Sequence, residues 1–355
     1  MPDDARLLSW QALALDPPWA HGRPPAVGLI RGDPGDFVVE ERLGFEPDGG
    51  AGHWLLWIEK RDANTLYVAK CLARFAGLPT RDIGFAGLKD RRAVARQWFS
   101  MPARRGLPLP AGHEGDGFRV LAAHPHSRKL RRGALAANRF VLKVRELTGD
   151  IPAVVARLQA IAAGGAPNYF GPQRFGRDGS NLRRVNEWLE SGDLPRDRAA
   201  RGFLLSSARS LAFNAVLGRR VADGSWNRLL PGEIANLDGS SSVFRVSEVD
   251  EQLERRCRDG DIHPSGPLCG AGDMQPVGVA ADCEQSVLEA LAPLPQRLAA
   301  VTAGERRALV VRPVGLVWQV NGPVLELGFE LPRGAFATSL LREALSATVP
   351  EAETD

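Results

Sequence analysis

Alternation of apolar and polar residues, the pattern of a half-buried β-strand, is concentrated towards the two ends of this 355-residue chain. Residues 140–145 alternate apolar with mostly basic positions, and residues 324–331 alternate apolar with polar or small ones. Between these regions helical and irregular patterns are mixed. One sheet that takes strands from both parts of the chain and is interrupted by a large insertion explains this distribution.

Local patterns predict further elements. Residues 37–41 and 53–60 are β-like runs separated by a turn rich in Gly, Pro and Asp, which predicts a hairpin. Asn64 is expected to cap a helix that ends near Gly77. The other expected elements are a Pro- and Gly-rich loop at 102–117, strands at 118–122, 316–320 and 324–331, the last two rejoining the first sheet, a helix from Val154 that ends at Gly164 and Gly165, a helix at 207–221, and a turn-rich region at 231–278.

Composition is that of an ordinary globular protein, with 44% hydrophobic and 25% charged residues. No run of eighteen apolar residues occurs, and the amino terminus, with Asp3 and Asp4, lacks the apolar core of a secretory signal. A soluble cytoplasmic protein is therefore expected. The four cysteines are too widely spaced for a paired-cysteine zinc site, so reduced thiols and no metal are expected.

Positive charge is concentrated between Phe118 and Arg145, where eight basic residues occur without an acidic one. Within this stretch, Arg128, Lys129, Arg131 and Arg132 are the favoured contacts to a phosphate backbone. The alternative is a solvated surface loop, which is common for runs of charge.

Asp90 is the most notable carboxylate, because Lys89, Arg91, Arg92 and Arg96 surround it in the sequence. Cations this close favour its ionised form, which makes it a candidate nucleophile. The alternative is that Asp90 caps a helix over residues 91–99, and spacing alone favours this cap. The two readings are compatible, since the positive end of a helix dipole would also favour the charged form.

Four segments of the chain resemble the TruD family of tRNA pseudouridine synthases. Residues 84–98, with the sequence GFAGLKDRRAVARQW, resemble its catalytic motif. Residues 34–49 resemble its amino-terminal motif, 168–176 (NYFGPQRFG) the start of its inserted domain, and 334–343 its carboxy-terminal motif. The matches follow the family order and span nearly the whole chain.

The resemblance implies an α+β fold, in which a pseudouridine synthase catalytic domain, built on a mixed, largely antiparallel sheet with flanking helices, is interrupted by a large inserted α/β TRUD domain. Residues 1–164 and 311–355 would form the two parts of the catalytic domain, and residues 165–310 the inserted domain. The implied activity is isomerisation of uridine to pseudouridine in tRNA, at uridine 13. Such a reaction needs no cofactor or metal, and the resemblance implies neither a membrane nor an obligate protein partner.

The resemblance also assigns residues to roles. Asp90 would be the nucleophile, attacking either the sugar or the base, and Arg31, at a position where the family often has lysine, would be its ionic partner. Phe140 would stack on the base, Asn138 would contact the uridine, and Phe37 and Phe336 would line the pocket. Lys89 is expected to contact RNA and is a rival partner for Asp90.

Four of these residues have a structural alternative. Arg31 could be an ordinary surface arginine, and Phe37, Phe140 and Phe336 could be core residues without contact to a base. Two other functions compete with the enzyme reading. A catalytically silent RNA-binding protein would be favoured by loss of the aspartate, but Asp90 is present. A hydrolase or nucleotide-binding enzyme is disfavoured, because the sequence has no Gly-x-Ser-x-Gly elbow and no Walker-type loop.

Overall fold

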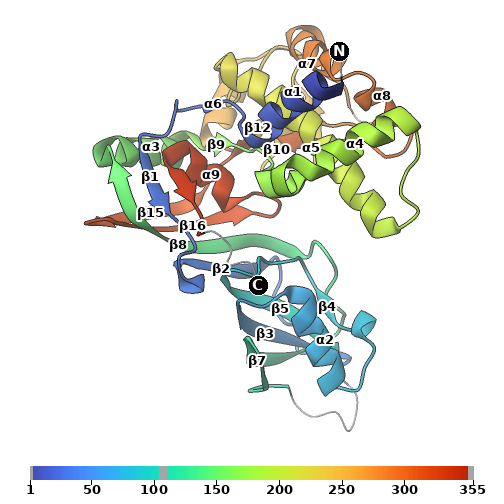
Figure 1. Cartoon of the computed structure of the whole chain (residues 1–355), viewed down its shortest axis with the longest axis vertical. Coiled ribbons are helices and arrows are strands. Elements are labelled where there is room, and N and C mark those ends of the chain that lie inside the picture. Colours follow the sequence, from blue (N-terminus) through green and yellow to red (C-terminus); the bar gives the residue numbers. More distant parts are fainter. Residues whose placement is uncertain (1–2, 104–109, 273, 351–355) are drawn as a thin grey trace. The chain divides into compact units, whose positions relative to one another are not determined.

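The computed structural model describes residues 3–103, 110–272 and 274–350 (Figure 1). Residues 104–109 of the expected Pro- and Gly-rich loop lie outside the described residues. The chain divides into two compact units. The sheet unit comprises Pro25–Ile151, Pro313–Gly334 and Leu345–Asp355, and the helical unit comprises Met1–Pro24, Pro152–Arg312 and Ala335–Ala344. These units are defined by packing, and the functional domains at 1–164, 165–310 and 311–355 stay a prediction.

An eleven-stranded mixed sheet forms the sheet unit, in the order β15-β16-β8-β2-β5-β3-β7-β6 with β1, β17 and β4 attached beside this path. Only the β2–β5 and β1–β17 pairs among the described residues are parallel. Its elements are β1 (Ala26–Leu29), β2 (Phe37–Leu43), β3 (His53–Arg61), α2 (Thr65–Phe75), β4 (Gly84–Phe85), β5 (Val94–Pro102), β6 (Glu114–Gly115), β7 (Phe118–His126), β8 (Leu135–Gly149), β15 (Val314–Asn321), β16 (Val324–Pro332), β17 (Ser346–Thr348) and the short 3₁₀ helices Pro34–Asp36 and Thr80–Asp82.

The alternating segments at residues 140–145 and 324–331 do meet in one sheet. β16 pairs antiparallel with β8, and Phe329 lies opposite Phe140. On β8, Phe140, Leu142 and Val144 are buried, whereas Arg139 and Arg145 on the other face are exposed. The expected strands, their return to the first sheet and the cationic outer face are thus confirmed, as is the expected α+β fold with a largely antiparallel sheet.

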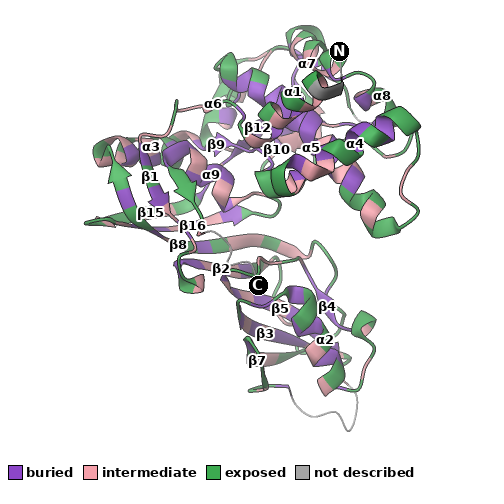
Figure 2. Cartoon of the chain, in the orientation of Figure 1, coloured by how far each residue is buried: buried purple, intermediate pink, exposed green. Residues whose placement is uncertain are grey.

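The expected hairpin between residues 37–41 and 53–60 is wrong. Both segments are strands, but β5 lies between them, parallel to β2 and antiparallel to β3. A turn signal reports only that the chain reverses, whereas the pairing partner depends on distant residues that bury the same face. Both β3 and β5 are accordingly rich in buried positions, while no residue of β15 is fully buried (Figure 2).

Helix α2 is present as expected, and it covers one face of the sheet. Val68 and Leu72, one turn apart, are fully buried against Leu56, Ile58 and Phe99 of the sheet. The chain after the helix passes through a glycine at position 77, whose φ of +60° disfavours other residues. Asn64 occupies the N-cap position but makes no side-chain capping hydrogen bond.

The helical unit is built around α5, which is longer than the helix expected at 207–221. Helices α1, α4, α7 and α8 pack on α5, as does strand β12, which belongs to a four-stranded antiparallel sheet in the order β11-β10-β12-β13. The elements are α1 (Asp3–Leu15), α3 (Ile151–Gly164), β9 (Ala166–Pro167), α4 (Ser180–Ser191), α5 (Arg198–Ala222), β10 (Ile234–Leu237), β11 (Val243–Arg245), α6 (Glu251–Asp259), β12 (Ile262–Leu268), α7 (Gly278–Ala290), α8 (Leu294–Ala299), β13 (Glu305–Ala308), β14 (Val310–Val311), α9 (Ala337–Ala344) and the 3₁₀ helices Pro172–Phe175 and Arg177–Gly179.

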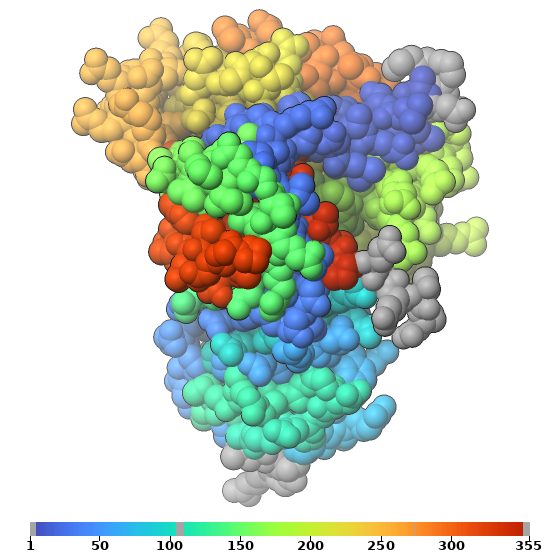
Figure 3. Space-filling model, turned by 60° about the vertical axis from the view of Figure 1, so that its left-hand side comes forward, coloured from blue at the N-terminus to red at the C-terminus, as the bar shows by residue number. Residues whose placement is uncertain are grey.

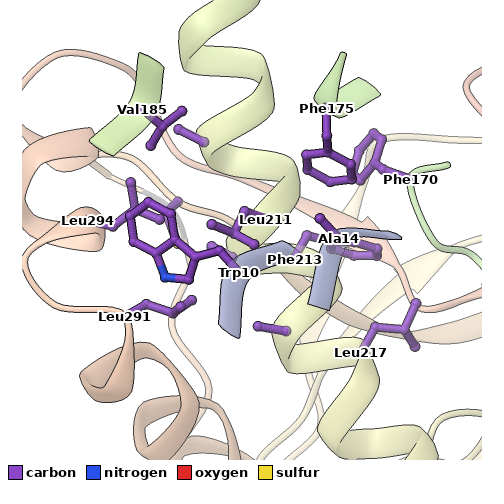
Figure 4. Packing of buried hydrophobic residues seen from close by; sticks show 14 of the residues in the cluster. Trp10, Ala14, Phe170, Phe175, Val185, Leu211, Phe213, Leu217, Leu291 and Leu294 are labelled. Atoms are coloured by element: carbon purple, nitrogen blue, oxygen red, sulfur yellow. The ribbon is translucent and has the colours of Figure 1, made fainter. Parts of the chain in front are cut away.

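Aromatic and aliphatic residues from distant segments form the core of the helical unit. Trp10 of α1, Leu211 and Phe213 of α5 and Leu294 of α8 are at most 2% exposed and lie together (Figure 4). Helix α1, which had no counterpart among the expected elements, packs on α4 and α5 and lies at the surface beside later segments of the same unit (Figure 3). Within the described residues, no helix is long and apolar enough to cross a membrane.

Candidate active site

Asp90 lies in an irregular loop between β4 and β5, and no helix begins there. The residues that the capping hypothesis assigned to a helix form β5, which carries Val94, Trp98 and Phe99. β-branched and aromatic residues favour strands, and β5 pairs with both β2 and β3. The predicted helix cap is therefore wrong, and so is the predicted help from a helix dipole.

The structure brings Arg31 and Asp90 into direct contact, with Arg31 Nη2 donating a hydrogen bond to Asp90 Oδ2. The Arg31 side chain is 11% exposed and the Asp90 side chain 41%. The guanidinium carbon lies 4.1 Å from the centroid of the Phe37 ring, within cation–π range. Arg31 also has a φ of +60°, which is uncommon for a residue other than glycine and is often found at functional sites.

The position of Phe37 is fixed by the hydrogen bonds of the preceding residue, Asp36. Asp36 is 2% exposed, and both of its carboxylate oxygens accept hydrogen bonds from Arg145 on β8, at 2.8 to 3.0 Å. A buried carboxylate held by one guanidinium group has little freedom to move. The ring beneath Arg31 therefore stands on an anchored segment.

Lys89 is directed into the protein. Its ammonium nitrogen lies 3.0 Å from Glu41 Oε1 and 2.5 Å from Asn138 Oδ1, and its side chain is only 7% exposed. Glu41 is fully buried, and burial raises the pKa of its carboxyl, an effect that the Lys89 charge opposes. Lys89 thus pairs with Glu41 rather than with Asp90, and its predicted contact to RNA stays a prediction.

The Lys89 contact also orients Asn138. An ammonium group can only donate hydrogen bonds, so the asparagine must turn its carbonyl oxygen towards Lys89. The Nδ2 amide group of Asn138 is then directed away from Lys89, and its two N–H groups can donate hydrogen bonds. A uracil ring offers carbonyl oxygens that could accept them.

Phe37 and Phe140 belong to one aromatic cluster. Their ring centroids are 6.1 Å apart with planes at 78°, and Phe140 stacks on Phe329 at 5.5 Å. Phe37 and Phe140 are 4% and 7% exposed. Both are thus packed as the core alternative requires, and their predicted contacts to the base stay a prediction.

Phe336 belongs to the helical unit and precedes α9. Its ring lies 6.2 Å from that of Phe170, and the guanidinium carbon of Arg174 lies within 6 Å of both ring centroids. Phe170 and Arg174 come from the segment that resembles the start of the family's inserted domain. The structure therefore joins two of the family-like motifs within this unit, and the predicted role of Phe336 in the pocket stays a prediction.

The basic segment at 128–132 connects β7 to β8. Arg128, Lys129, Arg131 and Arg132 are all exposed, whereas Leu130 between them is buried. Arg132 lies over the ring of Phe85, with 3.7 Å from its guanidinium carbon to the centroid. Four exposed cations on one connection suit a phosphate backbone.

Lys60 is a site residue that the sequence pattern did not indicate. It is completely buried on β3, where it donates hydrogen bonds to the carbonyl oxygens of Ala63 at 2.8 Å and Asp90 at 2.7 Å. Burial lowers the pKa of Lys60 to about 8, and Asp90 opposes this shift. A lysine within an alternating strand has no local signature of this role, because its partner is a backbone group thirty residues away.

Lys60 predicts that stability rises with pH in the alkaline range. Because its pKa falls from 10.5 to about 8 on folding, the unfolded chain binds more protons across that window, and stability rises there by up to about 1.4 kcal/mol per pH unit. The Lys60→Met variant has no titrating group at this position and therefore lacks this rise of stability with pH. Thermal unfolding of both proteins at about pH 7.5 and about pH 9.5 measures it. Wild type should gain stability relative to the variant at the higher pH, and an unchanged difference would contradict the prediction.

Among the described residues, no group of three or more His, Cys, Asp or Glu side chains is arranged to hold a metal ion. Cys71, Cys257, Cys269 and Cys283 are free thiols, as expected.

Comparison with known proteins places these features in a family. The family model "tRNA pseudouridine synthase D (TruD)" matches residues 18–201 and 197–344. The chain is 45% identical over 344 residues to tRNA pseudouridine synthase D of Xanthomonas axonopodis pv. citri, covering 92% of this chain and 93% of that protein. It is 42% identical over 349 residues to the protein of the same name from Pseudomonas fluorescens, covering 97% of this chain and 98% of the relative.

The fold has a solved counterpart. A crystal structure of a Methanosarcina mazei protein assigned to TruD superimposes with a TM-score of 0.71, at 22% identity, covering 94% of this chain and 97% of that one. The match to the family model and the identity to the bacterial relatives extend over most of the chain. The chain therefore belongs to the tRNA pseudouridine synthase D (TruD) family.

Proposed function

We propose that the chain isomerises uridine 13 of tRNA to pseudouridine, with Asp90 as the nucleophile. As a member of the TruD family it is an enzyme of the isomerase class. The observation that carries the proposal is the contact of Asp90 with Arg31, whose guanidinium group in turn lies on Phe37 beside Phe140. A charged carboxylate, its cation and two aromatic rings are the groups that such a reaction on a base requires.

In this reaction the C1′–N1 bond of the nucleoside breaks and a C1′–C5 bond forms. The Asp90 carboxylate assists detachment of the uracil, by attack on the sugar or on the base, and is regenerated at the end. The base turns before it is rejoined through C5, the C5 proton leaves, and N1 gains a proton. Atoms and electrons balance without a redox partner or a co-substrate.

Arg31 supports the reaction by holding the Asp90 carboxylate in place. With 11% exposure, its side chain is largely shielded from water, which strengthens its attraction to the carboxylate. The contact with Phe37 limits the conformations that the guanidinium group can adopt. The nucleophile is thereby directed before the substrate binds.

The uridine must leave the stack of bases to reach Asp90. Phe140 is proposed to stack on the extruded base and Phe37 and Phe336 to line the pocket, while the Nδ2 group of Asn138 donates to a uracil carbonyl. Lys89 supports this contact because it holds the carbonyl end of the Asn138 amide. Its predicted direct contact to RNA would require it to leave Glu41.

Arg128, Lys129, Arg131 and Arg132 are proposed to contact the tRNA backbone, since all four are exposed on the connection that enters β8. Binding should then weaken steeply as salt concentration rises. The lack of a cofactor requirement, the lack of an obligate protein partner and a cytoplasmic location also stay predictions.

The direct test is to incubate the protein with unmodified tRNA and to map pseudouridine at every uridine. Pseudouridine at position 13 is expected, with no product when that position is cytidine. Modification at another position only would overturn the choice of site. No pseudouridine at any position would overturn the enzymatic proposal.

Phe140→Leu separates stacking on the base from core packing. The substitution keeps an apolar side chain but removes ring volume from a packed site, so it should cost about 1 to 3 kcal/mol of stability. Loss of a stacking face should instead reduce the rate of product formation about 10- to 100-fold. The matched control is Phe99→Leu, which changes a fully buried core phenylalanine of β5. Equal rates for the two variants at equal stability would support the core alternative.

A further inference from the structure

The loop that carries Asp90 is held by side chains rather than by a sheet ladder or a helix. Residues 86–93 have no regular secondary structure, yet backbone groups in a buried setting must find hydrogen-bond partners. Three such groups, at Gly87, Lys89 and Asp90, bond to side chains from three elements, Lys60 of β3, Thr65 of α2 and Gln97 of β5. All three side chains belong to residues that are at most 2% exposed.

Thr65 and Gln97 form a relay whose donors and acceptors are fully determined. The Lys89 N–H donates to Thr65 Oγ1 at 3.0 Å. The Thr65 hydroxyl in turn donates to Gln97 Oε1 at 3.0 Å, which leaves the Nε2 group of Gln97 to donate to the Gly87 carbonyl at 2.6 Å. Because a backbone N–H only donates and a carbonyl only accepts, reversing either side chain would break a bond.

Lys60 fixes the other end of the same segment. Its Nζ bridges the carbonyl oxygens of Ala63 and Asp90, and thereby ties the loop to the connection between β3 and α2. A neutral amine keeps two N–H donors, so both bonds survive deprotonation. The peptide groups before and after Leu88 and the carbonyl group of Asp90 are therefore all hydrogen-bonded to side chains that extend from strands or a helix.

We propose that Lys60, Thr65 and Gln97 are positioning residues for the isomerisation, acting through the backbone of Gly87–Asp90 to direct the Asp90 carboxylate. This inference rests on the proposed role of Asp90 as nucleophile. A reacting group must be held to within about 0.5 Å of its productive position, and rigid elements do this better than loops. The three side chains give an irregular loop the rigidity of the strands and the helix from which they extend.

Thr65→Val and Thr65→Ser form the matched test. Valine keeps the shape of threonine but removes the hydroxyl, whereas serine keeps the hydroxyl and removes a methyl group. We expect Thr65→Val to lower the single-turnover rate about 10- to 100-fold, because a misplacement of about 1 Å at the reacting group can cost about 10²-fold. Affinity for tRNA should stay within about twofold, and Thr65→Ser should retain most of the rate, because the relay persists.

The readout separates positioning from general stability. Melting temperatures of both variants show how much stability each change removes, and a merely structural role predicts that rate loss follows stability loss. Equal rates for the valine and serine variants would overturn the proposal. So would a loss that appears in tRNA affinity and not in the rate.

Gln97→Met provides an independent variant, also informative if Thr65→Val does not fold. It removes the donor to Gly87 and should lower the rate to a similar extent. Because the relay works as a unit, the double variant should lose little more than either single one. Additive rate losses would show that Thr65 and Gln97 act separately and would overturn the relay.

Asp90→Asn, measured beside these variants, distinguishes the two possible failures. If this variant is as active as wild type, the proposed function of Asp90 fails whatever the Thr65 variants do. If it is inactive while Thr65→Val keeps the wild-type rate, the positioning inference alone fails.

Discussion

Replacement of Asp90 by asparagine is expected to reduce pseudouridine formation by at least about 10⁴-fold, the scale of losses seen when a nucleophile is removed. Asparagine has nearly the same shape as aspartate but carries no charge and cannot attack. The Asp90 side chain is 41% exposed but its partner Arg31 is only 11% exposed, so the weaker bond to asparagine should cost about 1 to 3 kcal/mol of stability. The measurement is single-turnover pseudouridine formation on unmodified tRNA, with circular dichroism and a melting curve to verify folding.

Asp62→Asn is the matched control. Asp62 is a nearby half-exposed aspartate whose carboxylate lies 3.3 Å from Arg91 Nε in a surface ion pair, and such pairs contribute about 0 to 1 kcal/mol. This variant should keep wild-type activity. Comparable losses in the two variants would mean that general charge near the loop, and not the Asp90 carboxylate, supports the reaction.

Arg31→Met is expected to lower the single-turnover rate about 10²- to 10³-fold, the usual range for loss of one well-placed hydrogen-bond donor at an active site. Methionine can still pack on Phe37, but it cannot bond to the Asp90 carboxylate. Arg31→Lys keeps the charge and loses only the planar guanidinium geometry, so we expect a loss of about tenfold or less. Together the two variants separate charge from guanidinium geometry.

Arg61→Met provides the control for the loss of a cation. Arg61 pairs with Asp33 at 2.8 Å, and both side chains are more than half exposed. This variant should retain the wild-type rate and lose at most a little tRNA affinity. If Arg31→Met is as active as Arg61→Met, then the Arg31 guanidinium group contributes nothing to the reaction, and another residue must be the ionic partner of the nucleophile.

Strands and helices with strong local patterns could be predicted from the sequence because their signals are local. The alternation in residues 140–145 and 324–331 predicted β8 and β16, and the start and stop signals at Asn64 and Gly77 predicted α2. Helix α6 was missed because most of its residues are charged, and Cys257 is its one fully buried residue. The hairpin failed for a different reason, since β5 is inserted between two strands that are adjacent in sequence order.

The residues of the site also divide into those that the sequence indicated and those that only the fold revealed. Its charged and aromatic residues could be named from motifs, including Asp90, Arg31 and Phe140. The buried residues that hold the loop could not, because Lys60, Thr65 and Gln97 act on backbone groups of distant residues. The RNA contact predicted for Lys89 stays a prediction, and no motif indicated its bonds to Glu41 and Asn138 inside the protein.

The sequence alone determined which residues are candidates for the chemistry, because the residue types of a motif and their order can be identified without knowledge of the fold. It determined that both parts of the chain supply strands to one sheet, because alternation reports burial of one face. Only the tertiary structure decided the setting of Asp90. In the sequence this aspartate is surrounded by Lys89 and three arginines, and only the family resemblance pointed to Arg31; in the fold Arg31, fifty-nine residues away, is the cation bonded to its carboxylate. Long-range strand pairing makes that choice, and no local pattern of charges contains it.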